Sequence, residues 1–337
     1  MKTVLVTGGA GFIGSHVVVE LVKAGYRPVI IDNFSNSERP VIRALQTLLN
    51  QEVTLYDCDY QNNKKLKEIG ETERPIGVIH FAAFKAVNES VKQPLKYYDN
   101  NVAGLIKLMK FIKALTKLKH FVYSSSCMVY GEPDQLPVKE DSPWKPATSP
   151  YGTTKQMGET ISSDTTVVSK HFNALSLRYF NPIGAHASAL IGELPIGKPQ
   201  NLVPFITQTA AKKQSSLTVF GNDYPTPDGS CIRDYIHVVD LAKAHVKALM
   251  HLEEKPPAYY DVFNIGTGHG SSVLEVIKTF EQVTDQKLMY TIGPRRLGDL
   301  TATYASIDKA RKVLNWKAEK SLAEALSDAW RWQQKLA

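Results

Sequence analysis

The chain has 337 residues, enough for one large core or two lobes, and its 43% hydrophobic and 22% charged residues are ordinary for a soluble globular protein. A formal net charge of +7 would suit a nucleic-acid or membrane partner. The lysines, however, are spread over several helical segments, and no arginine stripe with interleaved aromatics occurs. We therefore predict neither partner, and expect the charge to attract a small anionic substrate.

The cysteines and the hydropathy of the chain exclude further classes of protein. The spacing of Cys58, Cys127 and Cys231 fits neither a zinc knuckle nor a disulfide framework, so we predict no metal centre. No apolar run approaches the length of a membrane span, and the first residues read as a core strand, not as a signal peptide. We expect a cytoplasmic protein.

The first predicted elements are a strand, a glycine-rich turn and a helix. The strand is the apolar run from Val4 to Val6, and the helical pattern runs from Phe12 to Val22. Between and within them stand four glycines, Gly8, Gly9, Gly11 and Gly14. Such a turn brings backbone close to a pyrophosphate, which the first N–H groups of the helix can bind. Taken alone, the glycines also fit a purely structural turn.

The second strand supports a dinucleotide site. Val29 to Ile31 lead into Asp32, 18 residues after Gly14, where a carboxylate can accept both hydroxyls of an adenine ribose. No arginine occurs in the next five residues, from Asn33 to Ser37, so a 2′-phosphate would be repelled. The pattern predicts NAD and not NADP.

Strands and helices continue to alternate through the first half. A helix is expected around 40–49, strands at 53–56 and 78–81, and one long helix at 97–115 that carries Asn100. The strand at 78–81 runs into Ala82 and Ala83, whose small side chains allow a cofactor to lie against the backbone. Lys85 is close enough to reach its ribose or phosphate. Tight helix packing is the alternative explanation of the two alanines.

The next strand ends in the hydroxyls of Ser124, Ser125 and Ser126, at the edge where open α/β sheets bind ligands. After a proline-rich loop, Ser149 is predicted to cap a helix with Pro150 as its first residue. Tyr151 and Lys155 then share a helical face, and the ammonium should lower the pKa of the phenol. Such pairs are common on ordinary helices, so the interpretation depends on the preceding serines and the dinucleotide pattern.

Beyond residue 180 the alternation weakens and Gly, Pro and Asn become frequent. Residues 219–221 and 228–235 are expected to form turns between short strands, followed by an apolar strand at 262–265 and a final amphipathic helix at 322–334. The fold class predicted is α/β, a doubly wound parallel sheet of Rossmann type with a smaller C-terminal substrate-binding lobe. The expected boundaries are 1–180, joined by parts of 234–268, for the NAD-binding domain and 181–337 for the lobe.

Together these residues resemble the extended short-chain dehydrogenase/reductase family, and within it the branch of UDP-hexose 4-epimerases. The resemblance covers essentially the whole chain. Its most specific stretches are TGGAGFIGSH (7–16), SPYGTTK (149–155), RYFNPIGAH (178–186) and FGNDYPTPDGSCIRDYIHVVDLA (220–242). The last two belong to the epimerase branch.

The resemblance implies the following contacts, by position. NAD contacts fall on Gly8, Gly11, Phe12, Ile13, Asp32, Asn33, Asn36, Asp59, Tyr60, Phe81, Ala82, Ala83, Lys85, Asn100, Ser124, Tyr151, Lys155 and Phe180. Substrate contacts with a UDP-hexose fall on Ser126, Asn181, Asn201, Leu202, Phe220, Arg233, Arg296, Asp299 and Thr303. The expected catalytic residues are Tyr151, Lys155 and Ser126. Two arginines suit a diphosphate, because guanidinium groups pair well with phosphate oxygens.

Some positions depart from the pattern of the family. Cys127 and Met128 stand where the family usually has Ala-Thr, so a hydroxyl near the sugar is missing. Tyr60 replaces an aliphatic residue against the adenine, and Asn88 replaces a glycine. The nearest rival function, a sugar-nucleotide 4,6-dehydratase or decarboxylase, is disfavoured because dehydratases carry an Asp-Glu pair at the positions of Cys127 and Met128. A silent NAD-binding regulator is disfavoured because both Tyr151 and Lys155 remain.

Two finer expectations follow from the same resemblance. Thr303 matches the position that lines the 2-substituent of the sugar, and a small residue there admits N-acetyl sugars, so UDP-GlcNAc and UDP-GalNAc are expected as further substrates. A β-branched strand residue without this role is the alternative. The family also suggests a homodimer through the helices at 97–115 and 149–163.

Overall fold

The computed structural model describes residues 1–296 and 299–336. Its largest element is a seven-stranded sheet in the order β11-β6-β5-β4-β1-β2-β3, and every neighbouring pair in it is parallel. The strands are β1 (Lys2–Thr7), β2 (Tyr26–Asp32), β3 (Thr54–Asp57), β4 (Gly77–His80), β5 (His120–Ser126), β6 (Asn173–Tyr179) and β11 (Tyr260–Ile265). The order reverses between β1 and β4, and ligands bind at such a switch point in open α/β sheets. The predicted fold class is confirmed.

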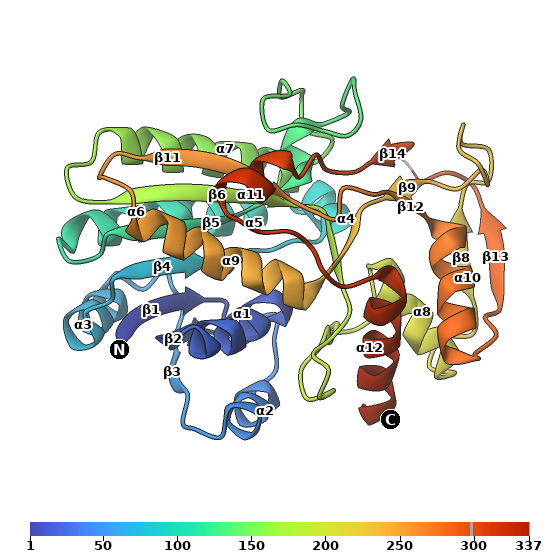
Figure 1. Ribbon diagram of the computed structural model, residues 1–337, viewed down its shortest axis with the longest axis horizontal. Coiled ribbons are helices and arrows are strands. Elements are labelled where there is room, and N and C mark those ends of the chain that lie inside the picture. Colours follow the sequence, from blue (N-terminus) through green and yellow to red (C-terminus); the bar gives the residue numbers. More distant parts are fainter. Residues whose placement is uncertain (297–298, 337) are drawn as a thin grey trace.

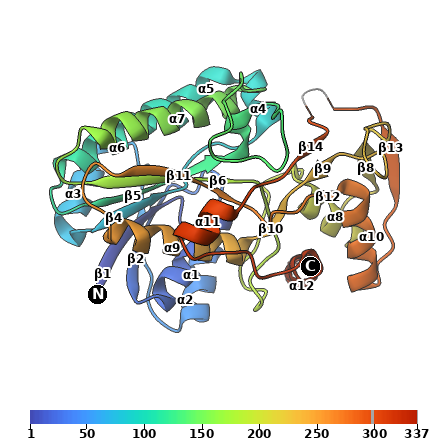
Figure 2. The same cartoon turned by 45° about the horizontal axis from the view of Figure 1, so that its top comes forward.

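Helices cover both faces of this sheet, as the two ribbon views show (Figures 1 and 2). One face carries α1 (Phe12–Lys23), α2 (Pro40–Leu49), α9 (Val238–Glu253) and α11 (Asp308–Val313). The other carries α3 (Asn63–Glu73), α4 (Val87–Lys92), α5 (Pro94–Tyr98), the π-helical turn η1 (Asp99–Ala103), α6 (Gly104–Ala114) and α7 (Pro150–Val167).

The alternation of side chains along each strand explains the two layers. Val4 and Val6 of β1 pack into the core under α1 and α9, whereas Leu5 packs into the core under α3 and α6. All three are fully buried. A strand that is covered on both faces must be apolar at every position, as observed.

The remaining elements lie beyond the carboxyl ends of the strands (Figure 1). They are the 3₁₀ turn η2 (Cys127–Tyr130), β7 (Asn181–Ile183), α8 (Leu202–Ala210), β8 (Leu217–Phe220), β9 (Ile232–Arg233), β10 (Tyr235–His237), β12 (Ser271–Ser272), α10 (Val273–Thr284), β13 (Tyr290–Gly293), β14 (Ala302–Thr303) and α12 (Leu322–Lys335). A separate apolar core joins α8, α10 and α12.

One predicted element is wrong in detail. The expected single helix at 97–115 is instead α5, the π turn η1 and α6 in succession. The break has a cause outside the helix, because the hydroxyl of Tyr60 donates to the carbonyl of Asn100 at 2.5 Å. Gly104 leaves room for that ring, since a Cβ there would lie 2.3 Å from the Tyr60 hydroxyl. π turns inside helices are frequent at functional sites.

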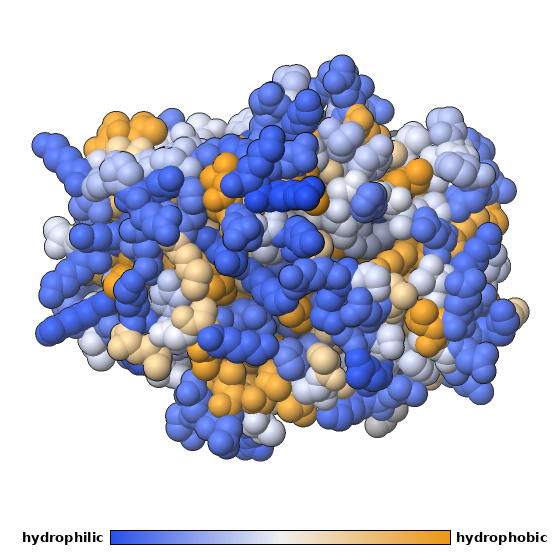
Figure 3. Space-filling model, in the orientation of Figure 1, coloured by the Kyte–Doolittle hydropathy of each residue, from blue (hydrophilic) through white to orange (hydrophobic). Residues whose placement is uncertain are grey.

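One face of the molecule is mainly polar (Figure 3). Figure 3 shows one face covered mainly by hydrophilic residues, with apolar residues in small separate groups. Within the described residues, every helix is too short or too polar to cross a membrane.

Candidate active site

The glycine turn between β1 and α1 is shaped by close backbone approach. Gly8 has a φ of +71°, and a Cβ there would lie 2.8 Å from the backbone nitrogen of Ala82 after β4. A Cβ on Gly14 would lie 2.2 Å from the carbonyl oxygen of Gly8. Among the described residues, no side chain caps α1. The first N–H groups of α1, which start at Phe12 and Ile13, are therefore left for a ligand, and the helix dipole favours an anion.

Asp32 ends β2 beside this turn and is buried. Its carboxylate accepts hydrogen bonds from the backbone N–H of Ala10 at 2.9 Å, from the N–H of Phe34 at 2.9 Å and from the hydroxyl of Ser37 at 3.0 Å. These three bonds fix the carboxylate and leave about one of its four lone-pair positions for a ribose hydroxyl. Asn36, the predicted contact next to Ser37, is exposed.

The ends of neighbouring strands place other predicted cofactor residues at the same edge. Asn33 donates to the carboxylate of Asp59 at 3.1 Å, which joins the ends of β2 and β3. Phe81, Ala82 and Ala83 follow β4 directly and are half-buried. Asn100 in η1 is held by Asn101 at 2.9 Å and by Gln61 at 3.2 Å. Tyr60 is buried against the ring of His80.

Ser126 and Tyr151 meet at the carboxyl end of β5. Ser149 accepts from the N–H of Gly152 at 3.2 Å and Pro150 opens α7, so the predicted cap is confirmed. Ser126 is the last residue of β5, and its hydroxyl lies close enough to Tyr151 to oppose the effect of burial, which raises the pKa of Tyr151. The ammonium of Lys155 donates to the carbonyl of Ser124 at 2.5 Å and lies 5.8 Å from the centre of the Tyr151 ring. The hydroxyl of Ser124 contacts that of Tyr179.

The pKa values of this pair correct the expectation from sequence. Burial raises the pKa of Tyr151 to about 12, against the opposing effect of Ser126, so the phenol is not activated by its neighbours alone. Burial also lowers the pKa of Lys155 to about 8, and the charge of Glu159 acts the other way. The sequence pattern placed the two groups correctly but could not show how deeply both would be buried.

Glu159 extends the face that carries Tyr151 and Lys155 by another helical turn. Its carboxylate accepts two hydrogen bonds from Nε of Arg178, at 2.9 and 3.1 Å, and one from Nη2 at 2.7 Å. It also accepts from the hydroxyl of Ser125. Both charged side chains are almost fully buried, so this pair fixes α7 to β5 and β6.

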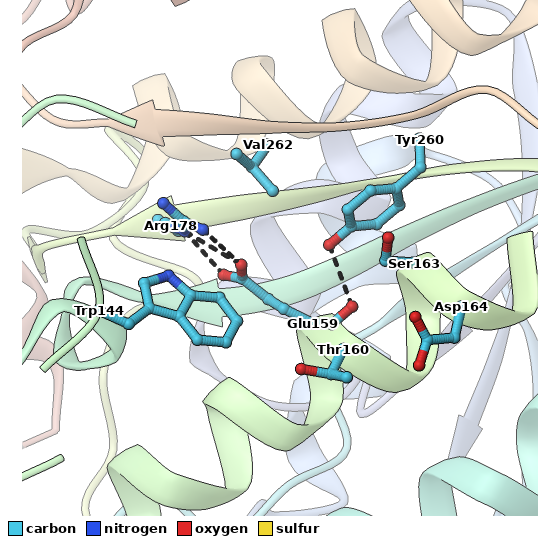
Figure 4. Close-up of a pocket in the computed structure, with 8 residues that line it drawn as sticks. All are labelled: Trp144, Glu159, Thr160, Ser163, Asp164, Arg178, Tyr260 and Val262. Carbon is cyan, nitrogen blue, oxygen red and sulfur yellow. Dashed lines mark hydrogen bonds and ion pairs between the residues drawn. The ribbon is translucent and has the colours of Figure 1, made fainter. Parts of the chain in front are cut away.

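An open pocket of about 250 Å³ lies over the outer side of this ion pair (Figure 4). Trp144 stands beside the guanidinium of Arg178, and the hydroxyl of Tyr260 donates to the backbone carbonyl of Glu159 at 3.3 Å. None of the predicted site residues lines it. The pocket lies over the buried ion pair that anchors α7.

Cys127, the first departure from the family pattern, follows Ser126 in η2 and is half-buried. Burial raises the pKa of its thiol to about 12, against the lowering effect of Arg233. At neutral pH the side chain is therefore an uncharged thiol that cannot serve as an acid–base group in the way a carboxyl would.

Two arginines and one carboxylate lie close together among the elements beyond the carboxyl ends of the sheet strands, which we call the smaller part of the structure. Arg296 makes two hydrogen bonds to Asp299, each of 3.0 Å, and Arg233 lies 3.6 Å from the same carboxylate. Arg296 also lies over the ring of Phe220, 5.4 Å from its centre. Positive charge beside an aromatic face can receive a nucleotide diphosphate.

Thr303 lies directly beside Arg233. The two residues are partners in the parallel pair β14–β9, and Thr303 is buried. Asp234, which follows Arg233 in the sequence, donates its backbone N–H to the carbonyl of Thr303 at 3.1 Å. Its own backbone carbonyl accepts the N–H of Asn181 at 3.0 Å. Its buried carboxylate accepts from Thr267 and from the N–H of Ala305 at 3.1 Å. Asp234 thus bonds to two predicted substrate residues, Thr303 and Asn181, and directly follows a third, Arg233.

The last predicted substrate residues are placed by α8. Asn201 immediately precedes this helix and Leu202 begins it. Phe180, a predicted NAD contact, is buried between β6 and β7. The side chain of Asn201 donates to Glu193 at 2.6 Å, and Lys85 donates to the same carboxylate oxygen at 3.2 Å. The structure therefore links a predicted cofactor residue and a predicted nucleotide residue through Glu193.

Comparison with known proteins agrees with this geometry. Residues 4–266 match the NAD dependent epimerase/dehydratase family. The chain belongs to this family.

Members of the family with assigned names match over nearly the full chain. UDP-glucose 4-epimerase of Dictyostelium discoideum is 48% identical over 98% of this chain and 95% of its own length. The solved UDP-glucose-4-epimerase of Stenotrophomonas maltophila, with bound NAD and formylated UDP-arabinopyranose, is 42% identical with a TM-score of 0.96, covering 100% of this chain and 99% of its own. That of Bifidobacterium longum, in complex with NAD+ and UDP, is 43% identical with a TM-score of 0.95, covering 99% and 98%.

Membership of this family confirms NAD as the predicted cofactor. Three residues that hold the site together were not predicted, Glu159, Glu193 and Asp234. Only Glu159 carries a local signal, since it lies four residues after Lys155 on the same helical face. Nothing near Glu193 in the sequence indicates its partners.

Proposed function

We propose that this protein is an NAD-dependent 4-epimerase that interconverts UDP-galactose and UDP-glucose through a 4-keto sugar. The observation that carries the proposal is the meeting of Tyr151, Lys155 and Ser126 at the sheet edge that also holds the glycine turn. An acid–base group beside a dinucleotide cradle suits oxidation of an alcohol. The arginines beyond that edge suit a substrate that carries a diphosphate.

The cofactor cradle fits NAD in three respects. The glycine turn has no Cβ that would block a pyrophosphate, the first N–H groups of α1 are open, and the Asp32 carboxylate is fixed for a ribose hydroxyl. NAD, when bound, supplies the hydride acceptor and later the hydride donor at C4 of the sugar. Because the sugar is finally returned to its original oxidation state, the cofactor is regenerated in each turnover.

Tyr151 takes the proton of the 4-hydroxyl group, and Ser126 hydrogen-bonds the same oxygen. Burial opposes ionisation of Tyr151, with a pKa of about 12 in the free protein. The positive nicotinamide ring of bound NAD⁺ and the ammonium of Lys155 would both favour the phenolate, so we infer that activation of Tyr151 requires bound cofactor. When the hydride returns to C4, Tyr151 gives the proton back to the oxygen.

Arg233 and Arg296 hold the diphosphate while the ketone rotates and exposes its other face. Guanidinium groups bind phosphate oxygens in pairs, so the nucleotide stays fixed while the sugar moves. Arg233 is itself held by the carbonyl groups of Ile232 and Leu300, at 2.7 and 2.8 Å. The tether keeps the reactive ketone in the site until it is reduced.

The rival reaction, 4,6-dehydration, needs an acid and a base beside the strand hydroxyl. The uncharged thiol of Cys127 and the thioether of Met128 supply neither. The proposal is tested by incubating the NAD-loaded protein with UDP-galactose and separating the products. We expect UDP-glucose without accumulation of NADH. A 4-keto-6-deoxy sugar would instead identify a dehydratase, and unchanged substrate a silent NAD-binding protein.

We also propose that the enzyme turns over UDP-GalNAc and UDP-GlcNAc. The support is Thr303, a small buried residue paired with Arg233 on β14 and β9. Thr303→Tyr should remove activity on the N-acetyl sugars and spare UDP-galactose, because the ring would overlap an acetamide but not a hydroxyl. Lack of UDP-GalNAc turnover by the unsubstituted protein would refute this proposal.

Finally, we propose a homodimer formed through the helices α4, α5, α6 and α7, which cover one face of the sheet. Large apolar side chains are exposed there, including Leu95 at 81%, Val91 at 61%, Met157 at 42% and Ile106 at 39%. Light scattering after size-exclusion chromatography should give twice the mass of the chain, and Leu95→Asp should shift it toward one chain. A monomeric unsubstituted protein would contradict the proposal.

A further inference from the structure

One carboxylate oxygen, Oε1 of Glu193, joins two parts of the active site that are far apart in sequence. It accepts from the ammonium of Lys85 at 3.2 Å and from the side-chain amide of Asn201 at 2.6 Å. Lys85 follows β4 at the cofactor edge, and Asn201 precedes α8 in the smaller part of the structure. The Glu193 side chain is 10% exposed, whereas that of Lys85 is 51% exposed, so the carboxylate is the fixed member of the ion pair.

The position of Glu193 does not depend on its own side chain. Its backbone carbonyl accepts from the indole nitrogen of Trp332 on α12 at 2.9 Å. Gly192 lies against the same indole, where a Cβ would be 2.5 Å from the ring. The N–H of His186 donates to the carbonyl of Ile191 at 3.0 Å, which closes the loop. Substitution of the carboxylate should therefore leave this segment in place.

The hydrogen bond from Asn201 to Glu193 takes the place of the helix cap that an asparagine at this position usually forms. Asparagine before a helix usually caps it by accepting a backbone N–H of the first turn. Within the described residues, no side chain makes that bond at α8, and Asn201 instead turns its amide N–H to Glu193. The amide oxygen of Asn201 is thereby left to face another group.

We propose that Glu193 is a positioning residue that couples the cofactor site to the nucleotide site. It holds Lys85 at the NAD edge and orients Asn201 toward the uridine nucleotide, so that each ligand is bound more tightly when the other is present. Such coupling is reciprocal by thermodynamic necessity. This inference rests on the proposed function for the identity of both ligands. Within the described part of the chain, no hydrogen bond or ion pair joins Glu193 to Tyr151, Lys155 or Ser126, so the chemical step should be nearly independent of it.

The test uses the full-length protein with Glu193→Ala and Glu193→Gln. Glu193→Ala removes both contacts, whereas Glu193→Gln keeps an acceptor oxygen for Asn201 and removes the charge that attracts Lys85. Glu68→Gln is the matched control, because Glu68 pairs with Lys65 at 2.9 Å on the exposed face of α3. The readouts are KM and kcat for UDP-galactose, UDP binding by calorimetry, and the rate of NAD loss during dialysis with and without UDP.

Loss of one hydrogen bond or ion pair changes a binding constant by about threefold to tenfold. We expect Glu193→Ala to raise KM and the UDP dissociation constant by that factor, to leave kcat within about twofold, and to reduce the protection that UDP gives against NAD loss. Glu193→Gln should speed NAD loss and change UDP binding less. The double substitution Lys85→Met with Glu193→Gln should lose NAD no faster than Lys85→Met alone.

Unchanged KM, UDP binding and NAD loss in Glu193→Ala would overturn the inference. So would a fall in kcat at constant KM, or additive effects of the two substitutions on NAD loss. UDP binding and NAD loss are measured without turnover, so they test Glu193 even if the proposed epimerase activity fails. Glu193→Ala could also lower the thermal midpoint while Glu193→Gln leaves it unchanged. If every change in binding were then restricted to Glu193→Ala, the role of Glu193 would be merely structural and the coupling would be refuted.

Discussion

Lys155 should lower the stability of the folded protein at neutral pH, because its ammonium is buried. Its side chain is 4% exposed, and burial lowers its pKa from 10.5 to about 8. The unfolded chain therefore binds more protons than the folded protein between these two pH values, and stability must rise with pH across that window. Lys155→Met removes the titrating group while keeping a side chain of similar length.

The size of the effect follows from the two pKa values. One pKa unit corresponds to about 1.4 kcal/mol, so the full cost of burying the ammonium, well below pH 8, is about 3.5 kcal/mol. As the pH rises above 7, the unsubstituted protein recovers about 1.4 kcal/mol by pH 9 and about 2.5 kcal/mol by pH 10. Lys155→Met recovers none of it. The lost hydrogen bond to Ser124 adds a constant difference that does not change this pH dependence.

Urea unfolding followed by tryptophan fluorescence at pH 7, 8, 9 and 10 measures this difference directly. The free energy of unfolding of the unsubstituted protein should rise relative to that of Lys155→Met by about 2.5 kcal/mol from pH 7 to pH 10. Lys64→Met, on the exposed face of α3, should show parallel curves. Parallel curves for Lys155→Met as well would show that the ammonium is not buried as described.

Three further predictions concern the same site. Tyr151→Phe should keep the fold and NAD but lose about 10²- to 10⁴-fold in kcat, and retention of more than about a tenth of the rate would exclude Tyr151 as the base. Asp32→Ala should lose NAD on gel filtration, and the unsubstituted protein should not retain NADP; comparable retention of NADP would contradict the role of this carboxylate. Glu159→Gln should lower the free energy of unfolding by about 3–5 kcal/mol, because the buried charge of Arg178 loses its partner. A loss below about 1 kcal/mol in urea unfolding would show that the pair is better solvated than its burial implies.

Features encoded by neighbouring residues were predictable from sequence. The glycine turn, Asp32 at the end of β2, and Ser149 with Pro150 at the start of α7 all depend on local backbone chemistry. The parallel sheet followed from the alternation of apolar strands and amphipathic helices. These signals lie within a few residues or turns, so one sequence is enough to show them.

Features that depend on distant packing were not predictable in the same way. The π turn at Asn100 is associated with a hydroxyl from Tyr60, 40 residues earlier. The raised pKa of Tyr151 reflects burial by several elements, which the spacing of Tyr151 and Lys155 does not reveal. Glu193 meets Lys85 across 108 residues of sequence. Such contacts become visible only once the chain is folded.

The most direct test of the proposed epimerase activity is the fate of the hydrogen at C4 of the substrate. UDP-galactose labelled with deuterium at C4 is incubated with the NAD-loaded protein in ordinary water, and the product is examined by mass spectrometry and NMR. Transfer of the hydride to NAD and back predicts UDP-glucose that keeps the deuterium at C4. Loss of the label to water, or its appearance in free reduced cofactor, would contradict it.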